Sequence, residues 1–176
     1  MDAKELLVGR RSVRKYKADA VSEEVLREVV ELASFAPSWK NTQISRYIAV
    51  TGELKDKVSA TLMEHNQNIV NGAPILIIQT DVEKRSGFER DGSFSTKKED
   101  RWQNYDAGIA GLQFCLAAYE KGLGTVIMGI FDEDEVASIV DIPEGQKIMA
   151  LIALGYPDEE PQAPKRKSVD DLLTIK

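Results

Sequence analysis

Residues 107–118 read Ala-Gly-Ile-Ala-Gly-Leu-Gln-Phe-Cys-Leu-Ala-Ala, and this stretch decides the fold. Gln113 is the only polar amide in it, so a helix formed here is apolar nearly all round. Such a helix is buried on all sides, and we predict a central core helix over about 102–120. Gly108, Ala110 and Gly111 are small enough to let another backbone approach closely. A dimer contact along the same helix is therefore a second interpretation, which stays open.

Shorter elements are predicted on both sides of this helix. An apolar run at 75–78 bounded by turn residues is typical of a strand buried on both faces. Glycine, proline and capping residues bound the other elements. We predict helices at 2–9, from Ser22 to Pro37, at 53–70 and at 131–140, and strands near 47–50, 75–81, 125–129 and 147–154.

About four strands and one buried helix indicate an α+β fold. We expect a central antiparallel or mixed sheet, flanked by helices, around the long buried central helix. The sequence contains no internal repeat and no stretch that reads as a linker. We therefore predict a single domain over residues 1–176.

Composition excludes several classes of function. The net charge of −6 and the pI near 5.0 argue against nucleic acid as a partner. No apolar run approaches the roughly 20 residues of a membrane helix, and residues 1–5 do not resemble a signal peptide. We therefore expect a cytoplasmic protein that binds no membrane. One cysteine, Cys115, and one histidine, His65, make no metal signature and leave a Ser-His-Asp or Cys-His mechanism improbable. Any chemistry is expected to come from a bound cofactor.

A cluster of positive charge stands out on this acidic chain. It reads Arg10-Arg11-Ser12-Val13-Arg14-Lys15-Tyr16 and contains four cations and a hydroxyl. The rigid fork of arginine suits phosphate oxygens, and Ser12 adds a short-range donor. The alternative interpretation is a solvated basic face. The sequence contains neither the dinucleotide-binding glycine fingerprint nor a Walker A motif, so a phosphate site here is not one of the common nucleotide folds.

Taken together, these motifs resemble the FMN-dependent nitroreductases over almost the whole chain. No single motif is specific, but their joint order and spacing are. The motifs are Arg-Arg-Ser-x-Arg-x-Tyr at 10–16, Ala36-Pro37-Ser38 followed by Asn41 and Gln43, Ala73-Pro74, Asp106-x-Gly108, Gly122-Leu123-Gly124, Gly129-x-Phe131 and Leu154-Gly155-Tyr156-Pro157.

The resemblance implies a nitroreductase-like fold and a homodimer with FMN at the subunit interface. It implies that Arg10, Arg11 and Ser12 hold the phosphate and ribityl chain, and that Arg14 lies near N1 and O2 of the flavin. The remaining implied FMN contacts are Pro37, Ser38, Trp39 and Asn41 from the other subunit, Met128, Gly129 and Ile130 beside the ring, and Lys165, Arg166 and Lys167 at the phosphate. Which of these last three cations faces the phosphate stays open. Trp39 is bulkier than the residue expected at its position.

The implied activity is the reduction of nitroaromatics, quinones or related acceptors with NAD(P)H, by ping-pong hydride transfer. The chemistry belongs to the flavin, so no catalytic side chain and no metal are expected, and Arg14 would tune the reduction potential. One alternative is a flavin-binding protein without turnover, such as a carrier or sensor. Another is a phosphate-binding module without flavin. The acceptor and the choice between NADH and NADPH cannot be read from the sequence.

Residues 83–101 are rich in glycine, serine and charge, with Phe88 and Phe94 embedded among them. A connection of this length is usually functional or disordered. In the context of the resemblance, we predict that 83–104 is a lid over the flavin face that sets the choice of acceptor. The alternative is a disordered surface loop whose aromatic side chains pack outside the sheet.

Overall fold

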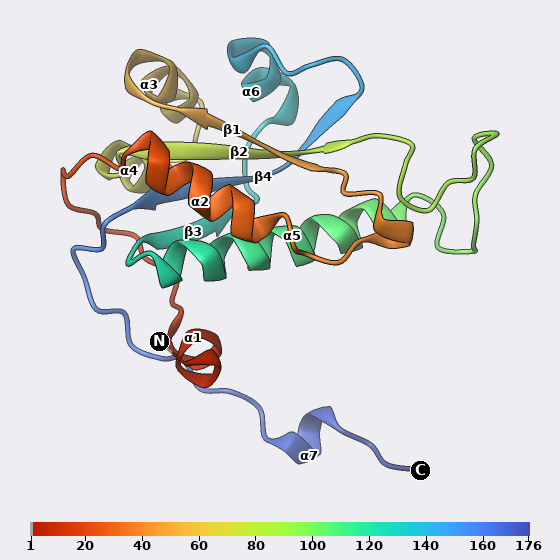
Figure 1. The fold of residues 1–176 in the computed structure, drawn as a ribbon. Helices are drawn as coiled ribbons and strands as arrows, with labels where there is room; N and C mark the ends of the chain where they lie inside the picture. The colour runs from red at the N-terminus through yellow and green to blue at the C-terminus, as the bar shows by residue number, and fades with distance from the viewer. Residues whose placement is uncertain (1) are drawn as a thin grey trace.

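The computed structural model describes residues 2–176 and contains a four-stranded sheet (Figure 1). The strand order is β1-β2-β4-β3, and each neighbouring pair is antiparallel. The predicted alternatives of an antiparallel or mixed sheet thus resolve to antiparallel. The strands are β1 (Ser45–Val50), β2 (Ile75–Val82), β3 (Gly124–Met128) and β4 (Gln146–Gly155).

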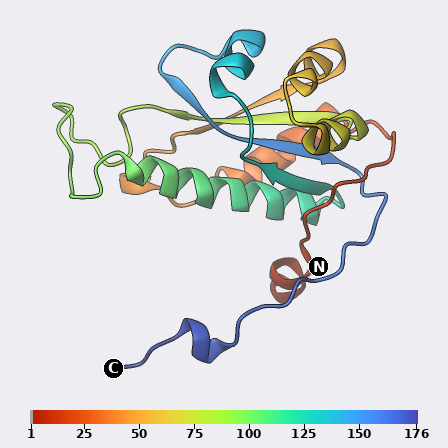
Figure 2. The same ribbon diagram turned by 180° about the vertical axis from the view of Figure 1, so that it is seen from behind.

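The two central strands are buried on both faces because helices cover both sides of the sheet. Side chains alternate along β2. Ile75 and Ile77 belong to the core beneath α2 and α5, whereas Leu76 and Ile78 belong to the core beneath α3, α4 and α6. Figures 1 and 2 show these two helical layers on opposite faces. The fully apolar sequence of β2 thus follows from its central position.

Most predicted element boundaries agree with the structure to within a few residues. Ser22 caps the second helix as expected, because its Oγ accepts a hydrogen bond from the Val25 N–H at 3.2 Å. The helices are α1 (Ala3–Gly9), α2 (Glu23–Ala33), the 3₁₀ turn η1 (Trp39–Asn41), α3 (Gly52–Ala60), α4 (Glu64–Gly72), α5 (Arg101–Glu120), α6 (Glu133–Val140) and α7 (Val169–Leu172).

The prediction of one helix over 53–70 is wrong, because α3 and α4 are separate helices. The amides of Thr61 and Leu62 close the first helix with tight bonds to the carbonyls of Val58 and Ser59. The break lets both helices lie on the same face of the sheet, where Val58, Leu62 and residues of α4 share one core.

The prediction that the central helix is buried on all sides is also wrong. Phe114 and Ala118 of α5 are fully buried against the sheet and α2. Gly108 is exposed and the side chain of Leu112 is 51% exposed. The sheet and α2 cover only part of the circumference, and α1 contacts α5 as well, but Gly108 and Leu112 stay exposed within residues 2–176. Among the described residues, no helix has the length and hydropathy needed to cross a membrane.

Candidate functional site

The basic segment, residues 10–16, is an extended chain docked beside β3. The Val13 amide donates to the Thr125 carbonyl at 2.9 Å, and Ser12 pairs with Thr125 in a parallel bridge. Gly124 permits this approach, because a Cβ there would lie 2.8 Å from the Val13 side chain. Val13 is buried in the core, so alternation along the extended chain turns Ser12 and Arg14 the other way.

A cavity of about 210 Å³ lies between this segment, α5 and β3. The basic segment contributes a cation and a hydroxyl, both half-buried. Helix α5 and strand β3 contribute mostly small or apolar groups. The lining residues are Arg10, Ser12, Gly108, Leu112, Cys115, Thr125 and Ile127. Arg10 makes one wall of the cavity positively charged, and the opposite wall is apolar. We call it the basic cavity.

The arginines in this region are available to an anion. The Arg11 guanidinium donates to the carbonyls of Val8 at 2.6 Å and Arg10 at 2.8 Å, which holds it against the end of α1. Within residues 2–176, neither Arg10, Arg11 nor Arg14 forms an ion pair. The nearby acid Glu159 instead accepts hydrogen bonds from the main-chain amides of Arg14 and Lys15. This donor set suits a phosphate group.

Cys115 lines the cavity, and its burial disfavours the reactive thiolate form. Burial raises the pKa of its thiol, against the smaller opposing effects of the Thr125 hydrogen bond and the Arg10 charge. A thiol with a raised pKa stays protonated at neutral pH and reacts slowly. The side chain therefore serves as packing.

The second predicted contact set lies in the segment between α2 and β1. Ser38 and Trp39 are half-buried, whereas Pro37 and Asn41 are exposed. The residues Lys40, Asn41 and Gln43 have φ angles of 44°, 56° and 48°. Such left-handed conformations are costly for residues with a Cβ and persist where the surroundings fix them. One contact that stabilises this conformation is the hydrogen bond from the Gln43 main-chain N–H to Ser38 Oγ, at 2.9 Å.

Residues 83–100 form a folded loop that packs on this segment, which answers the question of order that the sequence left open. Phe88 and Phe94 pair across an antiparallel bridge, with ring centroids 4.9 Å apart. The ring centroids of the two tryptophans, Trp39 and Trp102, lie 4.6 Å apart, and the ring planes are tilted by 44°. The bulk of Trp39 thus packs against the start of α5. Whether the loop acts as a lid stays a prediction.

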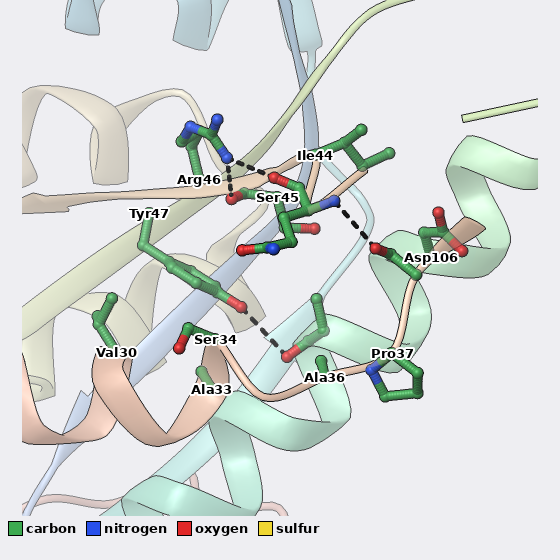
Figure 3. Close-up of a pocket in the computed structure, with 13 residues that line it drawn as sticks. Val30, Ala33, Ser34, Ala36, Pro37, Ile44, Ser45, Arg46, Tyr47 and Asp106 are labelled. Carbon is green, nitrogen blue, oxygen red and sulfur yellow. Dashed lines mark hydrogen bonds between the residues drawn. The ribbon is translucent and has the colours of Figure 1, made fainter. Parts of the chain in front are cut away.

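A second cavity, of about 300 Å³, lies between α2, residues 36–47 and α5 (Figure 3). Its walls include Pro37, Ser38 and Asp106, and the Tyr47 hydroxyl donates to the Ala110 carbonyl at 3.2 Å on its floor. None of the basic residues 10–14 lines it. Conversely, none of residues 37–41 lines the basic cavity. One chain therefore does not bring the two predicted contact sets into one cavity.

The remaining predicted site residues, 128–130 and 165–167, differ in their exposure to solvent. Met128 is buried in the core beneath α3, α4 and α6, so only its main chain is available to a ligand. Gly129 and Ile130 are exposed. The three cations at 165–167 are exposed in the tail that leads to α7, which extends away from the sheet in both ribbon views (Figures 1 and 2).

Sequence reasoning did not select five residues that line the basic cavity: Gly108, Leu112, Cys115, Thr125 and Ile127. A usable signal was present in β3, because Thr125 and Ile127 alternate with the buried Val126 and Met128. The positions on α5 could not be found without knowing which side of the helix the sheet covers.

Comparison with known proteins decides the family. The profile described as "Nitroreductase family" matches residues 7–71 and 60–156. The chain belongs to the nitroreductase family. The predicted family and enzyme class, an NAD(P)H nitroreductase-like oxidoreductase, are thereby confirmed at the level of the family.

Individual relatives of this nitroreductase-family chain cover nearly its whole length. The NADH dehydrogenase of Thermus thermophilus is 29% identical over 91% of this chain and 89% of its own. A nitroreductase-family protein of Streptococcus pneumoniae superposes with a TM-score of 0.87 over 99% and 100% of the two chains, at 20% identity, and confirms the fold. A "putative nitroreductase" of Desulfovibrio desulfuricans, crystallised in complex with FMN, is 25% identical over 98% and 95% of the two chains, with a TM-score of 0.77.

Proposed function

We propose that this nitroreductase-family protein binds FMN and uses NADH or NADPH to reduce nitroaromatics, quinones or related small acceptors. One observation carries the proposal: Arg10, which is half-buried and forms no ion pair within residues 2–176, and Ser12 line a cavity whose other wall is apolar. The wall with Arg10 and Ser12 can bind a phosphate, and the apolar wall can pack against a planar ring. The complex of the Desulfovibrio relative with FMN supports the choice of ligand.

Each chain element has a separate task in this proposal. Arg10, Arg11 and Ser12 hold the phosphate and the ribityl chain, with the cations at 165–167 as further partners. Arg14, which is exposed, lies at the pyrimidine edge. The main chain of 128–130 lies beside the ring. Bound FMN supplies hydride transfer at N5, and the protein residues bind, orient and set the electrostatic potential.

We further propose that residues 1–176 act as one domain within a homodimer, with FMN at the subunit interface. Residues 37–41 are separate from the basic cavity within one chain, so in a dimer they would complete the site of the partner. The exposed face of α5 at Gly108 and Leu112 borders the basic cavity and offers the surface for that contact.

The visible spectrum of the purified protein tests the cofactor. We expect a flavin spectrum and, after heat release, FMN rather than FAD on chromatography. A colourless protein that takes up no added FMN would contradict the proposal and favour a phosphate-binding module without flavin.

Anaerobic mixing with NADH and NADPH separately tests catalysis. We expect rapid bleaching by at least one donor, followed by reoxidation with a nitroaromatic or a quinone. Flavin that neither donor reduces would instead support the carrier or sensor alternative.

A further inference from the structure

Asp106, in the second turn of α5, carries a buried carboxyl group. Its side chain is 3% exposed. Among the described residues it takes part in none of the ion pairs. Its Oδ2 accepts hydrogen bonds from the Trp39 main-chain N–H at 2.9 Å and from the Ser86 hydroxyl at 2.5 Å. Hydrogen bonds, rather than a counter-ion, stabilise this charge.

The two donors come from different segments of the chain. Trp39 lies in the strained segment 38–43, and Ser86, which is fully buried, lies near the start of the folded loop 83–100. Hydrogen bonds to a charged acceptor are stronger than neutral ones. One carboxylate on a rigid helix therefore holds both segments at the same point.

The other contacts between these segments are weaker or more exposed. Lys40 and Glu89 form an ion pair at 2.9 Å, but about half of each side chain is exposed, and such pairs contribute little. The Trp39–Trp102 contact depends on the position of Trp39, whose amide is held by Asp106. Gly87, beside Ser86, has a φ of 86° and lies so close to the Glu99 carbonyl that a Cβ would clash. The hydrogen bonds to Asp106 are thus the most buried of these links.

We propose that Asp106 is a positioning residue that fixes segment 38–43 and loop 83–100 to α5 as one unit, and that this unit shapes the acceptor side of the site. The inference rests on the proposed function for its kinetic part only. Loss of the carboxylate leaves a buried amide and a buried hydroxyl without their acceptor, which is costly. Both segments are then released together, while the basic cavity, which shares no residue with the junction, is retained.

The first test uses the two tryptophans, because the chain contains no others. Their contact predicts a circular-dichroism signal from the pair that Trp102→Phe abolishes. Asp106→Ala should remove this signal, whereas Asp106→Asn, whose amide oxygen can still accept, should keep part of it. Trypsin should cut at Lys97 and Lys98 about tenfold faster in Asp106→Ala. Asp100→Ala, which removes an exposed acid at the start of α5, is the matched control and should change neither readout.

The second test is kinetic. In Asp106→Ala we expect the KM for the acceptor to rise about tenfold, with a smaller change in kcat. FMN binding should weaken less than in Arg10→Ala, because the basic cavity keeps all of its residues and only the contacts from residues 37–41 are loosened. Ser86→Ala removes only the loop contact, so it should raise both the tryptic cleavage rate and the acceptor KM while largely keeping the tryptophan signal. If Asp106→Ala does not fold, Ser86→Ala is used to test the proposal in its place.

Three results would overturn the proposal. The first is an unchanged tryptophan signal and tryptic rate in Asp106→Ala. The second is a parallel loss of FMN, kcat and thermal stability, which indicates general packing. The third is a Ser86→Ala variant identical to the unmodified protein. If the unmodified protein binds no flavin, the proposed function fails, but the dichroism and proteolysis still judge Asp106.

Discussion

At the scale of single residues, neighbouring arginines in the basic segment have different surroundings. Arg10 lines the cavity and is half-buried, Arg11 is held by carbonyls at the end of α1, and Arg14 is exposed with its guanidinium 3.4 Å from the Ser12 carbonyl. Similar residue types therefore have separable roles, and single substitutions can distinguish them.

Arg10→Ala should weaken FMN binding. A charged hydrogen bond to phosphate in a half-buried cavity contributes about 1.5–3 kcal/mol, so the Kd should rise about 10- to 100-fold. Fluorescence titration of the apoprotein with FMN measures it. Arg27→Ala, which removes an exposed cation paired with Glu23 on α2, is the control. Equal affinities in the two variants would remove Arg10 from the site.

Arg14→Ala should lower the flavin reduction potential, because a cation near N1 stabilises the anionic reduced ring. Partial exposure of the site limits the effect to about 20–40 mV. Equilibration with a reference dye measures the potential. Arg14→Lys keeps the charge and should retain most of the potential. If Arg14→Ala and the unmodified protein have the same potential, Arg14 does not tune the flavin.

Asp81 makes stability depend on pH. Its Oδ1 accepts a hydrogen bond from Ser45 Oγ at 2.7 Å, whereas its Oδ2 is buried and has no hydrogen-bond partner among residues 2–176. Burial raises the pKa of this carboxyl from 3.8 to about 6, with a smaller contribution from the Asp106 charge, and the Ser45 hydrogen bond opposes the rise. The folded protein therefore binds this proton more tightly than the unfolded chain, and stability falls as pH rises between these two values.

Asp81→Asn should accordingly stabilise the protein at about pH 8 by about 1–2 kcal/mol, and the gain should vanish below about pH 4. Urea unfolding at several pH values measures it. Asp56→Asn, at an exposed position of α3, should show no such trend. A gain for Asp81→Asn that is independent of pH would show that its ionisation is not the cause.

At the scale of elements, loop 83–100 and segment 38–43 form a joint structure although 40 or more residues separate them in sequence. The loop has its own internal pairing at Phe88 and Phe94, and its Glu89 forms an ion pair with Lys40 of the segment. A loop with this internal order can be replaced without disturbing the sheet.

Replacement of 86–98 by a Gly-Ser linker should leave FMN binding and assembly intact and change the ranking of acceptors. The physical reason is that the loop packs on segment 38–43, which we propose to lie beside the flavin, and shares no residue with the basic cavity. The two half-reactions are measured separately with nitroaromatic, quinone and enone acceptors. If each acceptor keeps its original rate, the loop is not a lid, and specificity lies nearer Trp39.

At the scale of the whole molecule, the exposed apolar surface lies beside the candidate site. Leu112 on α5, Ile127 on β3 and the neighbouring Ile130 are each at least half exposed. Contiguous apolar exposure of this kind marks an interaction surface. The side of α5 that is exposed in one chain is therefore the surface that we propose for the dimer contact.

We predict a homodimer that persists at micromolar concentration and keeps its flavin. Burial of apolar surface along α5 supplies the stability, and Leu112→Glu should weaken assembly and FMN binding together. Sedimentation with absorbance at the flavin band measures both. A folded 19.6 kDa monomer that retains FMN would contradict this prediction. Leu54→Glu, at a partly exposed position on α3 across the sheet, is the control.

Local signals in the sequence were enough to predict the element types, the α+β class and the family resemblance. These signals are the apolar run of β2, the cap at Ser22, the glycines that follow α5, and motifs whose order the chain preserves. It also located the basic segment, because four cations in seven residues are visible without any fold.

Three features became visible in the folded chain alone: which side of α5 is covered, where the helix at 53–70 breaks, and that Asp106 joins Trp39 to Ser86. Burial on one side of a helix depends on what packs there, and a hydrogen bond between residues 67 positions apart in sequence has no local signature. Periodicity reports how apolar a face is. Long-range packing determines what covers that face, and so which polar groups are brought together.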